Sequence, residues 1–177
     1  MNFKDKISGD NLVVVDIETS GLHYNGDNPA EIIEISAIRF KDGQEAGRYH
    51  SYVKNATPLS KEISALTEIT DEMLSDAPDI SMVMNEFCAF ANGALVAAYN
   101  APFDYGFLEM YAEKCGCTLP DKWIDVLGIA KQKIKDGVKS YKLKDVAKYF
   151  NILYPDNGGT EEYVLATADV LFALSKI

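Results

Sequence analysis

The sequence predicts an α/β fold in which a mixed sheet is covered by helices. Residues 12–17 form a short β-branched apolar run of the kind found in buried strands. Residues 31–40 alternate in polarity and are rich in isoleucine, which indicates a second strand. Residues 80–91 and 103–115 instead place apolar side chains at helical spacing. Strands followed by helices in this order are typical of a layered α/β domain.

The remaining elements follow from turn and capping residues. The turn at Lys41-Asp42-Gly43 leads into a third strand at 45–53, so residues 12–53 are expected to form an antiparallel meander. Residues 58–73 have the composition of short helical turns and connections. The other expected elements are strands at 94–98 and 123–126, parallel in the sheet, and helices near 126–135, 142–150 and 161–176, the last with Thr160 as its N-cap.

The composition is that of a globular protein and favours one domain over residues 1–177. Hydrophobic residues make up 47% of the chain and charged residues 25%, which is sufficient for a core. No apolar run approaches the roughly 20 residues of a membrane helix, and no signal-type stretch follows Met1. Cytoplasmic localisation without membrane contact is therefore expected, and three cysteines without a framework spacing agree with it. Cys115-Gly116-Cys117 has no partner pair for a metal site, so unreactive thiols are favoured.

The charge is unevenly distributed along the chain. The net charge is −10, but residues 131–148 contain seven lysines against two aspartates, a local net charge of +5. The rest of the chain therefore carries −15. An acidic body with one basic stretch suits a protein that binds divalent cations and also contacts an anionic ligand. The alternative is a lysine-rich helix face that is simply solvated.

Four acidic residues are candidates for chemistry. Asp16 and Glu18 lie two residues apart at the end of the most apolar strand, so both side chains share one face of it. Such a pair repels unless a cation offsets it, although an exposed strand end with two solvated acids is the alternative. Asp104 follows another strand at a helix start, where it could also act as an N-terminal helix acid. Asp169 lies in an apolar stretch of the last helix, where a metal ion is a reasonable partner.

Six segments of the sequence are informative as an ordered set. They are 14–22 (VVDIETSGL), 32–38 (IIEISAI), 66–73 (LTEITDEM), 98–108 (AYNAPFDYGFL), 123–125 (WID) and 140–143 (SYKL). In this order they resemble the motifs of the DnaQ-like DEDD 3′–5′ exonucleases. That family includes the proofreading epsilon subunit and the exonuclease domain of bacterial DNA polymerase III. Glu68 stands where the family usually has glycine.

The resemblance implies both a fold and a chemistry. The implied fold is ribonuclease H-like, and Asp16, Glu18, Asp104 and Asp169 would hold two divalent ions. Two ions about 4 Å apart can activate a water and stabilise the leaving 3′-oxygen of a phosphodiester. Carboxylate ligands favour Mg²⁺ or Mn²⁺ over zinc. The implied partner is nucleic acid with a free 3′ end, most of all single-stranded DNA, together with a possible DNA polymerase partner and a role in replication or repair.

Substrate contacts also follow from the resemblance. Thr19, Ser20 and Leu22 come directly after the first acids and are expected to line the pocket for the terminal nucleotide. Leu66 and Phe103 are candidates to pack against bases, because flat apolar contact tolerates any base. The alternative for Leu66 and Phe103 is ordinary core packing.

The expected base of the third motif is missing. The family has a histidine five residues before its last acid or a tyrosine four before it, and here those positions are Val164 and Leu165. Tyr163 and Glu162 are the neighbouring candidates to replace the base, although a regular helix turns Tyr163 away from Asp169. The expectation that follows is that Val164→His raises the exonuclease rate.

Two functions of different classes remain open at this point. The first is a metal-dependent 3′–5′ exonuclease that hydrolyses phosphodiester bonds at the 3′ ends of single-stranded DNA, with RNA less favoured. The second is a catalytically weakened or silent nucleic-acid-binding member of the same fold, suggested by the missing base. A purely structural protein is disfavoured by the intact acids.

Overall fold

The computed structural model describes residues 7, 11–23, 26, 29–155 and 158–177. None of the helices in these ranges is both long enough and apolar enough to span a membrane. The elements are β1 (Leu12–Thr19), β2 (Ile32–Lys41), β3 (Gln44–Tyr52), α2 (Lys61–Thr67), α3 (Asp71–Ser75), α4 (Ile80–Ala91), β4 (Leu95–Ala98), α5 (Ala101–Cys115), β5 (Trp123–Asp125), α6 (Val126–Lys133), α7 (Leu143–Tyr149) and α8 (Thr160–Leu174).

The five strands form one mixed sheet in the order β3-β2-β1-β4-β5. β1, β2 and β3 are the expected antiparallel meander, and β4 and β5 run parallel to β1. The tight turn between β2 and β3 places Asp42 at φ 52° and Gly43 at φ 74°. Two successive positive φ angles match the right-handed twist of a hairpin, and Asp-Gly is the sequence that tolerates them best. Helices connect the parallel strands, as parallel pairing requires.

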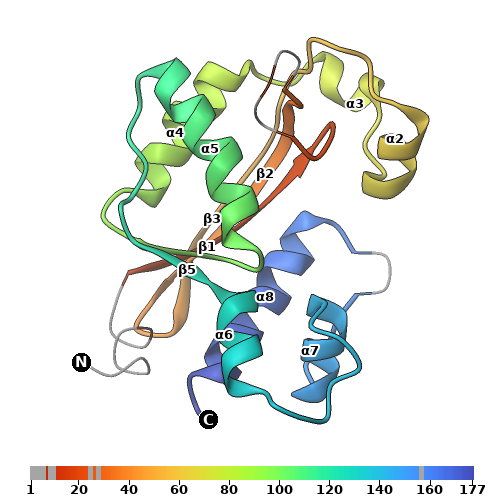
Figure 1. The fold of residues 1–177 in the computed structure, drawn as a ribbon. Coiled ribbons are helices and arrows are strands. Elements are labelled where there is room, and N and C mark those ends of the chain that lie inside the picture. Colours follow the sequence, from red (N-terminus) through yellow and green to blue (C-terminus); the bar gives the residue numbers. More distant parts are fainter. Residues whose placement is uncertain (1–6, 8–10, 24–25, 27–28, 156–157) are drawn as a thin grey trace.

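The sheet separates two apolar layers (Figure 1). α4 and α5 cover one face, where Val13, Val15 and Ile17 of β1 point. α6, α7 and α8 cover the other face, where Leu12 and Val14 point. Alternation along β1 therefore assigns the even-numbered positions, including 16 and 18, to the face that carries α8.

Most predicted elements are confirmed, and the differences are local. α4 has the predicted bounds, and the meander and the parallel strands match within two residues. α5 begins at Ala101 rather than Phe103, because Pro102 fits the first turn of a helix. The prediction for Thr160 was wrong: Gly159 is the N-cap of α8, and Thr160 is its first helical residue. The Thr160 hydroxyl bonds to Glu34 instead.

Candidate active site

Three of the four predicted acids meet where β1 extends beyond its neighbour. β4 pairs with β1 only as far as Val14, so the following residues of β1 have an open edge. α5 begins at this edge, and the backbone N–H of Ile17 donates a hydrogen bond to the carboxylate of Asp104. Asp104 is only 3% exposed. The sequence therefore brings Asp16, Glu18 and Asp104 together through one strand end and one helix start.

The three carboxylates are close enough to disturb one another. Burial raises the pKa of Asp16 well above its usual value, and the charges of Asp104, Glu18 and Glu34 raise it further. Burial, followed by the charge of Glu34, raises the pKa of Glu18 to about 7. Burial also raises the pKa of Asp104 to about 8, although two backbone hydrogen bonds oppose the shift. The charges that raise these pKa values are all other carboxylates, and within the described ranges no Lys or Arg charge opposes them.

Glu34 is a fourth acid of this cluster that sequence reasoning missed. It lies directly opposite Glu18 in the β1–β2 ladder and is 6% exposed. Its Oε1 lies 2.6 Å from Nε2 of His50, and its Oε2 accepts a hydrogen bond from the hydroxyl of Thr160. The signal in the sequence was a Glu within an otherwise apolar strand. Its position opposite Glu18 depends on the register of β2 against β1, which cannot be derived from the sequence.

Glu18 and Glu34 open into a cavity of about 410 Å³ between the sheet, α2 and the start of α8. Leu66 of α2 lines one side of this cavity. Tyr163 of α8 lines another side and stacks on Tyr154, with ring centroids 5.5 Å apart. The remaining lining residues are Tyr52, Ala65, Thr67, Glu68, Ile69, Met73, Gly158, Gly159 and Thr160.

The structure does not bring Asp169 to the other three predicted acids. Val164, Thr167, Ala168 and Leu171 form the buried side of α8, and Asp169 is exposed. The charge that acts on Asp169 is that of Lys176, in the turn that follows α8. The prediction of a metal role for Asp169 is therefore corrected: helix periodicity turns this carboxylate away from Asp16.

The expected position of a general base is also corrected. Val164 is fully buried in the apolar layer between α8 and the sheet, so a side chain at this position has no route to the cavity. Leu165 packs against the same layer, and Glu162 is exposed. Of the third-motif candidates, Tyr163 is the one that lines the cavity with Glu18.

The predicted substrate contacts fall into three groups. Thr19 and Ser20 support the loop after β1: the Thr19 hydroxyl donates to the carbonyl of Gly21, and Ser20 Oγ accepts from the N–H of Glu31. Leu22 and Leu66 are large apolar side chains left 74% and 78% exposed. Phe103 packs on the core side of α5, 5.1 Å from the ring of Phe107, which agrees with the core alternative.

The donor chemistry of the cluster fits a hard divalent cation. All of its side-chain donors are carboxylate or hydroxyl oxygens, which Mg²⁺ and Mn²⁺ prefer. The hydroxyl of Ser36, opposite Asp16 in the ladder, is buried without a hydrogen-bond partner. Within the described ranges, no three acidic, histidine or cysteine side chains already converge as a metal cage. Asp16, Glu18 and Asp104 are therefore the residues that would hold an ion here.

The raised pKa values predict how the metal-free protein responds to pH. The folded state keeps protons on Glu18 and Asp104 that unfolded carboxyl groups have already lost, so stability should fall as pH rises from about 5 to about 8. Melting temperatures in the presence of a chelator measure this directly. Asp104→Asn should flatten the slope, whereas Asp121→Asn, at an exposed site at the opposite end of the strands, should not. A melting temperature that rises over this interval would contradict the assignment.

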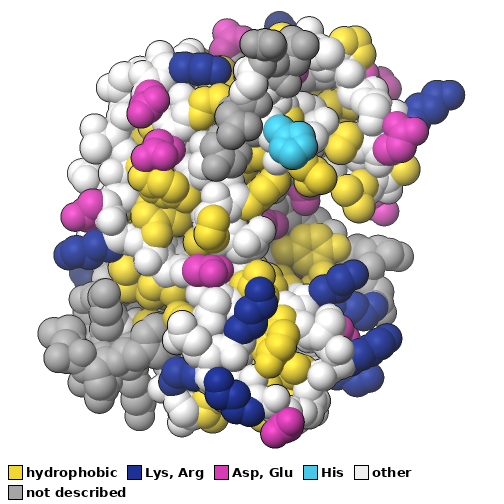
Figure 2. Space-filling model, viewed as in Figure 1, with side chains coloured by type: hydrophobic (Ala, Val, Ile, Leu, Met, Phe, Trp, Pro, Cys, Tyr) yellow, Lys and Arg dark blue, Asp and Glu magenta, His cyan; other side chains and the backbone are white. Residues whose placement is uncertain are grey.

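The lysines of residues 131–148 lie on α6, on α7 and in the loop between these helices. All but Lys133 are exposed, and Figure 2 shows Lys and Arg side chains gathered along the lower half of the molecule. Lys131 and Lys142 line an open groove of about 580 Å³ with Tyr99, Asn100, Leu127, Ser140, Tyr141 and Leu143. Asn100 is the N-cap of α5, the helix that carries Asp104. The basic groove therefore meets the acidic cluster at the β4–α5 loop.

A mixed sheet of this order with carboxylates at the end of its central strand defines a ribonuclease H-like nuclease fold. A family model described as "Exonuclease" matches residues 13–154, and the chain belongs to this exonuclease family. Dependence on divalent metal ions is general in the family.

Individual relatives agree with this assignment. The chain is 35% identical over 163 residues to the DNA polymerase III PolC-type protein of Caldanaerobacter subterraneus subsp. tengcongensis, which covers 92% of this chain and 11% of that protein. The chain spans about a tenth of the length of the first curated relatives that it matches.

Solved structures show the same fold at lower identity. "Exonuclease X in complex with 5' overhanging duplex DNA" has a TM-score of 0.64 at 24% identity, covering 90% of this chain and 89% of that chain. "3'-end specific recognition of histone mRNA stem-loop by 3'-exonuclease" has a TM-score of 0.76 at 16% identity, covering 95% and 82%.

Proposed function

We propose that this chain is a metal-dependent 3′–5′ exonuclease domain that removes nucleotides from single-stranded DNA with Mg²⁺ or Mn²⁺. The carboxylate cluster of Asp16, Glu18 and Asp104 carries the proposal, because its buried acids repel one another and its Glu18 lines a cavity. The nucleic-acid complexes among the structural neighbours and the polymerase relatives support it. Association with a DNA polymerase, for proofreading or repair, is part of the same proposal.

Different residues of the site have different roles in the proposed reaction. Two divalent ions would act as Lewis acids on the scissile phosphate, with their positive charge offsetting the repulsion within the cluster. Asp16, Glu18 and Asp104 would hold these ions at the end of β1. Leu66, exposed at the rim of the cavity, packs against the terminal base. Glu34 holds the first turn of α8 in place through Thr160, which keeps Tyr163 in the cavity.

The basic groove gives the strand a path away from the cluster. Lys131 and Lys142 would contact phosphates upstream of the 3′ end, and Tyr99 and Tyr141 line the same groove. Phosphate contacts of this kind supply affinity without sequence preference. The basic groove of Lys131 and Lys142 therefore offers a single strand a favourable path on an otherwise acidic chain.

The test is hydrolysis of single-stranded DNA carrying a label at its 5′ end, with Mn²⁺ present. Stepwise shortening from the 3′ end supports the proposal. Binding of the strand without shortening supports the second candidate, a nucleic-acid-binding domain that does not cleave. The specific observation in favour of that candidate is α8, which presents Tyr163 rather than an acid or a histidine to the cavity.

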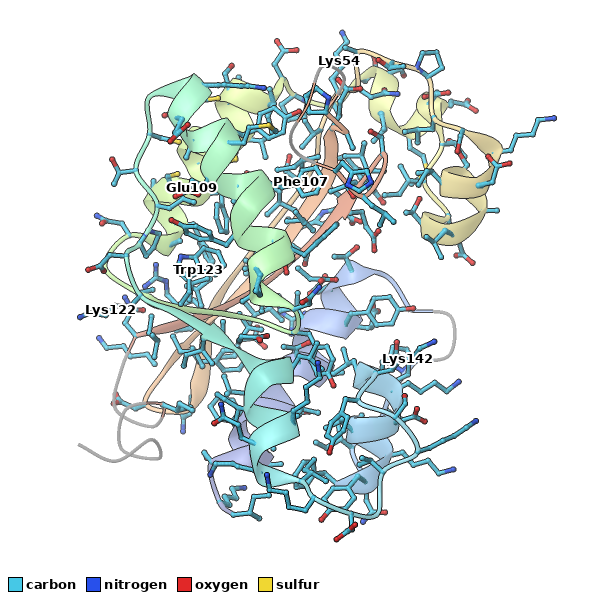
Figure 3. All side chains as sticks on the ribbon, in the orientation of Figure 1. Lys54, Phe107, Glu109, Lys122, Trp123 and Lys142 are labelled. Atoms are coloured by element: carbon cyan, nitrogen blue, oxygen red, sulfur yellow. The ribbon has the colours of Figure 1, made fainter. Side chains whose placement is uncertain are left out.

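The groove makes a separate prediction about salt. Changing Lys131 and Lys142 together to Glu should weaken single-strand binding and make its salt dependence shallower, by about 0.7 in log–log slope for each phosphate that the protein no longer neutralises. Lys122→Glu, compared with Lys142→Glu alone, is the matched control, because Lys122 lies on the opposite side of the molecule from Lys142 (Figure 3). Equal slopes for the double variant and the control would assign these lysines to the solvated surface instead.

A further inference from the structure

Two cysteines far apart in sequence meet at the side of the sheet that α4 and α5 cover. Cys88 lies in the last turn of α4 and is 7% exposed. Cys117 follows the end of α5, where Gly116 adopts φ 70° and turns the chain back. The N–H of Cys117 donates to the carbonyl of Ala112, which fixes the turn. As a result, the two Sγ atoms lie 3.0 Å apart.

We propose that Cys88 and Cys117 form a thiol–disulfide exchange site that closes to an internal disulfide with a low-molecular-weight disulfide such as oxidised glutathione. A disulfide needs an S–S separation of about 2.05 Å. The thiols are already in contact, so a small rotation of the side chains suffices. Cys117 is the partly exposed member of the pair, and it gives the reagent access.

The exchange balances in two steps. The Cys117 thiolate attacks one sulfur of glutathione disulfide, which forms a mixed disulfide and releases one glutathione thiolate. Cys88 then loses its proton and attacks Sγ of Cys117, which releases the second glutathione. The two protein thiols are oxidised and one glutathione disulfide is reduced to two thiols. Burial raises the pKa of the Cys88 thiol to about 12, so Cys88 suits the second, intramolecular step rather than the first.

Cys115 provides an internal comparison. It is the third free thiol of the chain and is partly exposed, two residues from Cys117. Its position in the last turn of α5, before the Gly116 turn, separates it from the contact that Cys117 makes with Cys88. If accessibility alone determined the product, Cys115 would be crosslinked as readily as Cys117.

The crosslink would join the end of α4 to the end of α5 and enclose residues 88–117. That loop contains β4 and the whole of α5, including Asp104. Closing a loop of this length restricts the unfolded chain, so the oxidised protein should melt roughly 5 to 10 °C higher than the reduced protein. Dithiothreitol should reverse the shift.

The experiment oxidises the full chain with glutathione disulfide at mildly alkaline pH, alkylates free thiols and maps the peptides by mass spectrometry. Wild type and Cys115→Ala should both give a Cys88–Cys117 crosslink and lose two free thiols. Cys88→Ala should stop at a mixed disulfide on Cys117 without the rise in melting temperature. Crosslinks to Cys115, three thiols left free, or a crosslinked protein that melts lower than the reduced form would each overturn the proposal.

Discussion

Replacing Asp104 with asparagine should abolish both the Mn²⁺-dependent rise in melting temperature and the nuclease activity, while Asp169→Asn leaves both unchanged. A ligand that binds only the folded state raises its stability, so a wild-type protein that holds Mn²⁺ must melt higher with it. Asp104 lies in the carboxylate cluster, and Asp169 is exposed on α8 beside the charge of Lys176. Losing the ion removes several kcal/mol of transition-state stabilisation, on the order of 10³-fold in rate.

Comparing the two variants tests whether Asp169 shares the metal-binding role of Asp104 that the family resemblance implies. Both changes replace an aspartate with the amide of the same size, so they are matched in side-chain shape. Melting curves with and without Mn²⁺ measure binding, and product formation from single-stranded DNA measures rate. If Asp169→Asn removed the response to Mn²⁺ as completely as Asp104→Asn, α8 would have to be oriented differently from the structure.

A histidine should have opposite effects at positions 163 and 164. Val164→His puts an imidazole into the apolar layer between α8 and the sheet, where Val164 is fully buried. The expected cost is about 2–4 kcal/mol, or roughly 5–15 °C in melting temperature. The sequence alone suggested the reverse, a gain in rate at Val164.

Tyr163→His places the same imidazole in the cavity with Glu18 and should preserve the fold. An imidazole accepts a proton near neutral pH, which a phenol does not, so the nuclease rate should rise by about 10²-fold, the lower end for a positioned base. Tyr163→Phe is the companion variant, since it removes only the hydroxyl. A drop in rate for Tyr163→Phe together with no gain for Tyr163→His would mean that Tyr163 already serves the reaction.

The elements with strong local signals were predictable from the sequence. The helical spacing in residues 80–91 gave the bounds of α4, and the β-branched run gave β1. The end of β1, with Asp16 and Glu18, and the start of α5, with Asp104, can both be predicted from local sequence. These are also the residues that the family motifs contain.

What the sequence could not supply was orientation. Asp169 is flanked by Ala166, Ala168 and Val170, so α8 is apolar on nearly every side and its period does not reveal which side faces the site. Glu34 joins the cluster only through the register of β2 against β1. The contact between Cys88 and Cys117 depends on how α4 packs beside α5. Each of these is a tertiary property.

The place of α8 in the fold sets a limit on how short this protein can be made. The shared sequence signature of the family ends at residue 154, whereas α8 starts at Thr160. α8 nevertheless covers β1 and β2, and the hydroxyl of its Thr160 donates a hydrogen bond to Glu34. A chain cut at the end of the signature would uncover the part of the apolar layer that lies over β1 and β2, and it would leave the buried carboxylate of Glu34 without the hydrogen bond from Thr160. The unit that folds is therefore longer than the unit that defines the family.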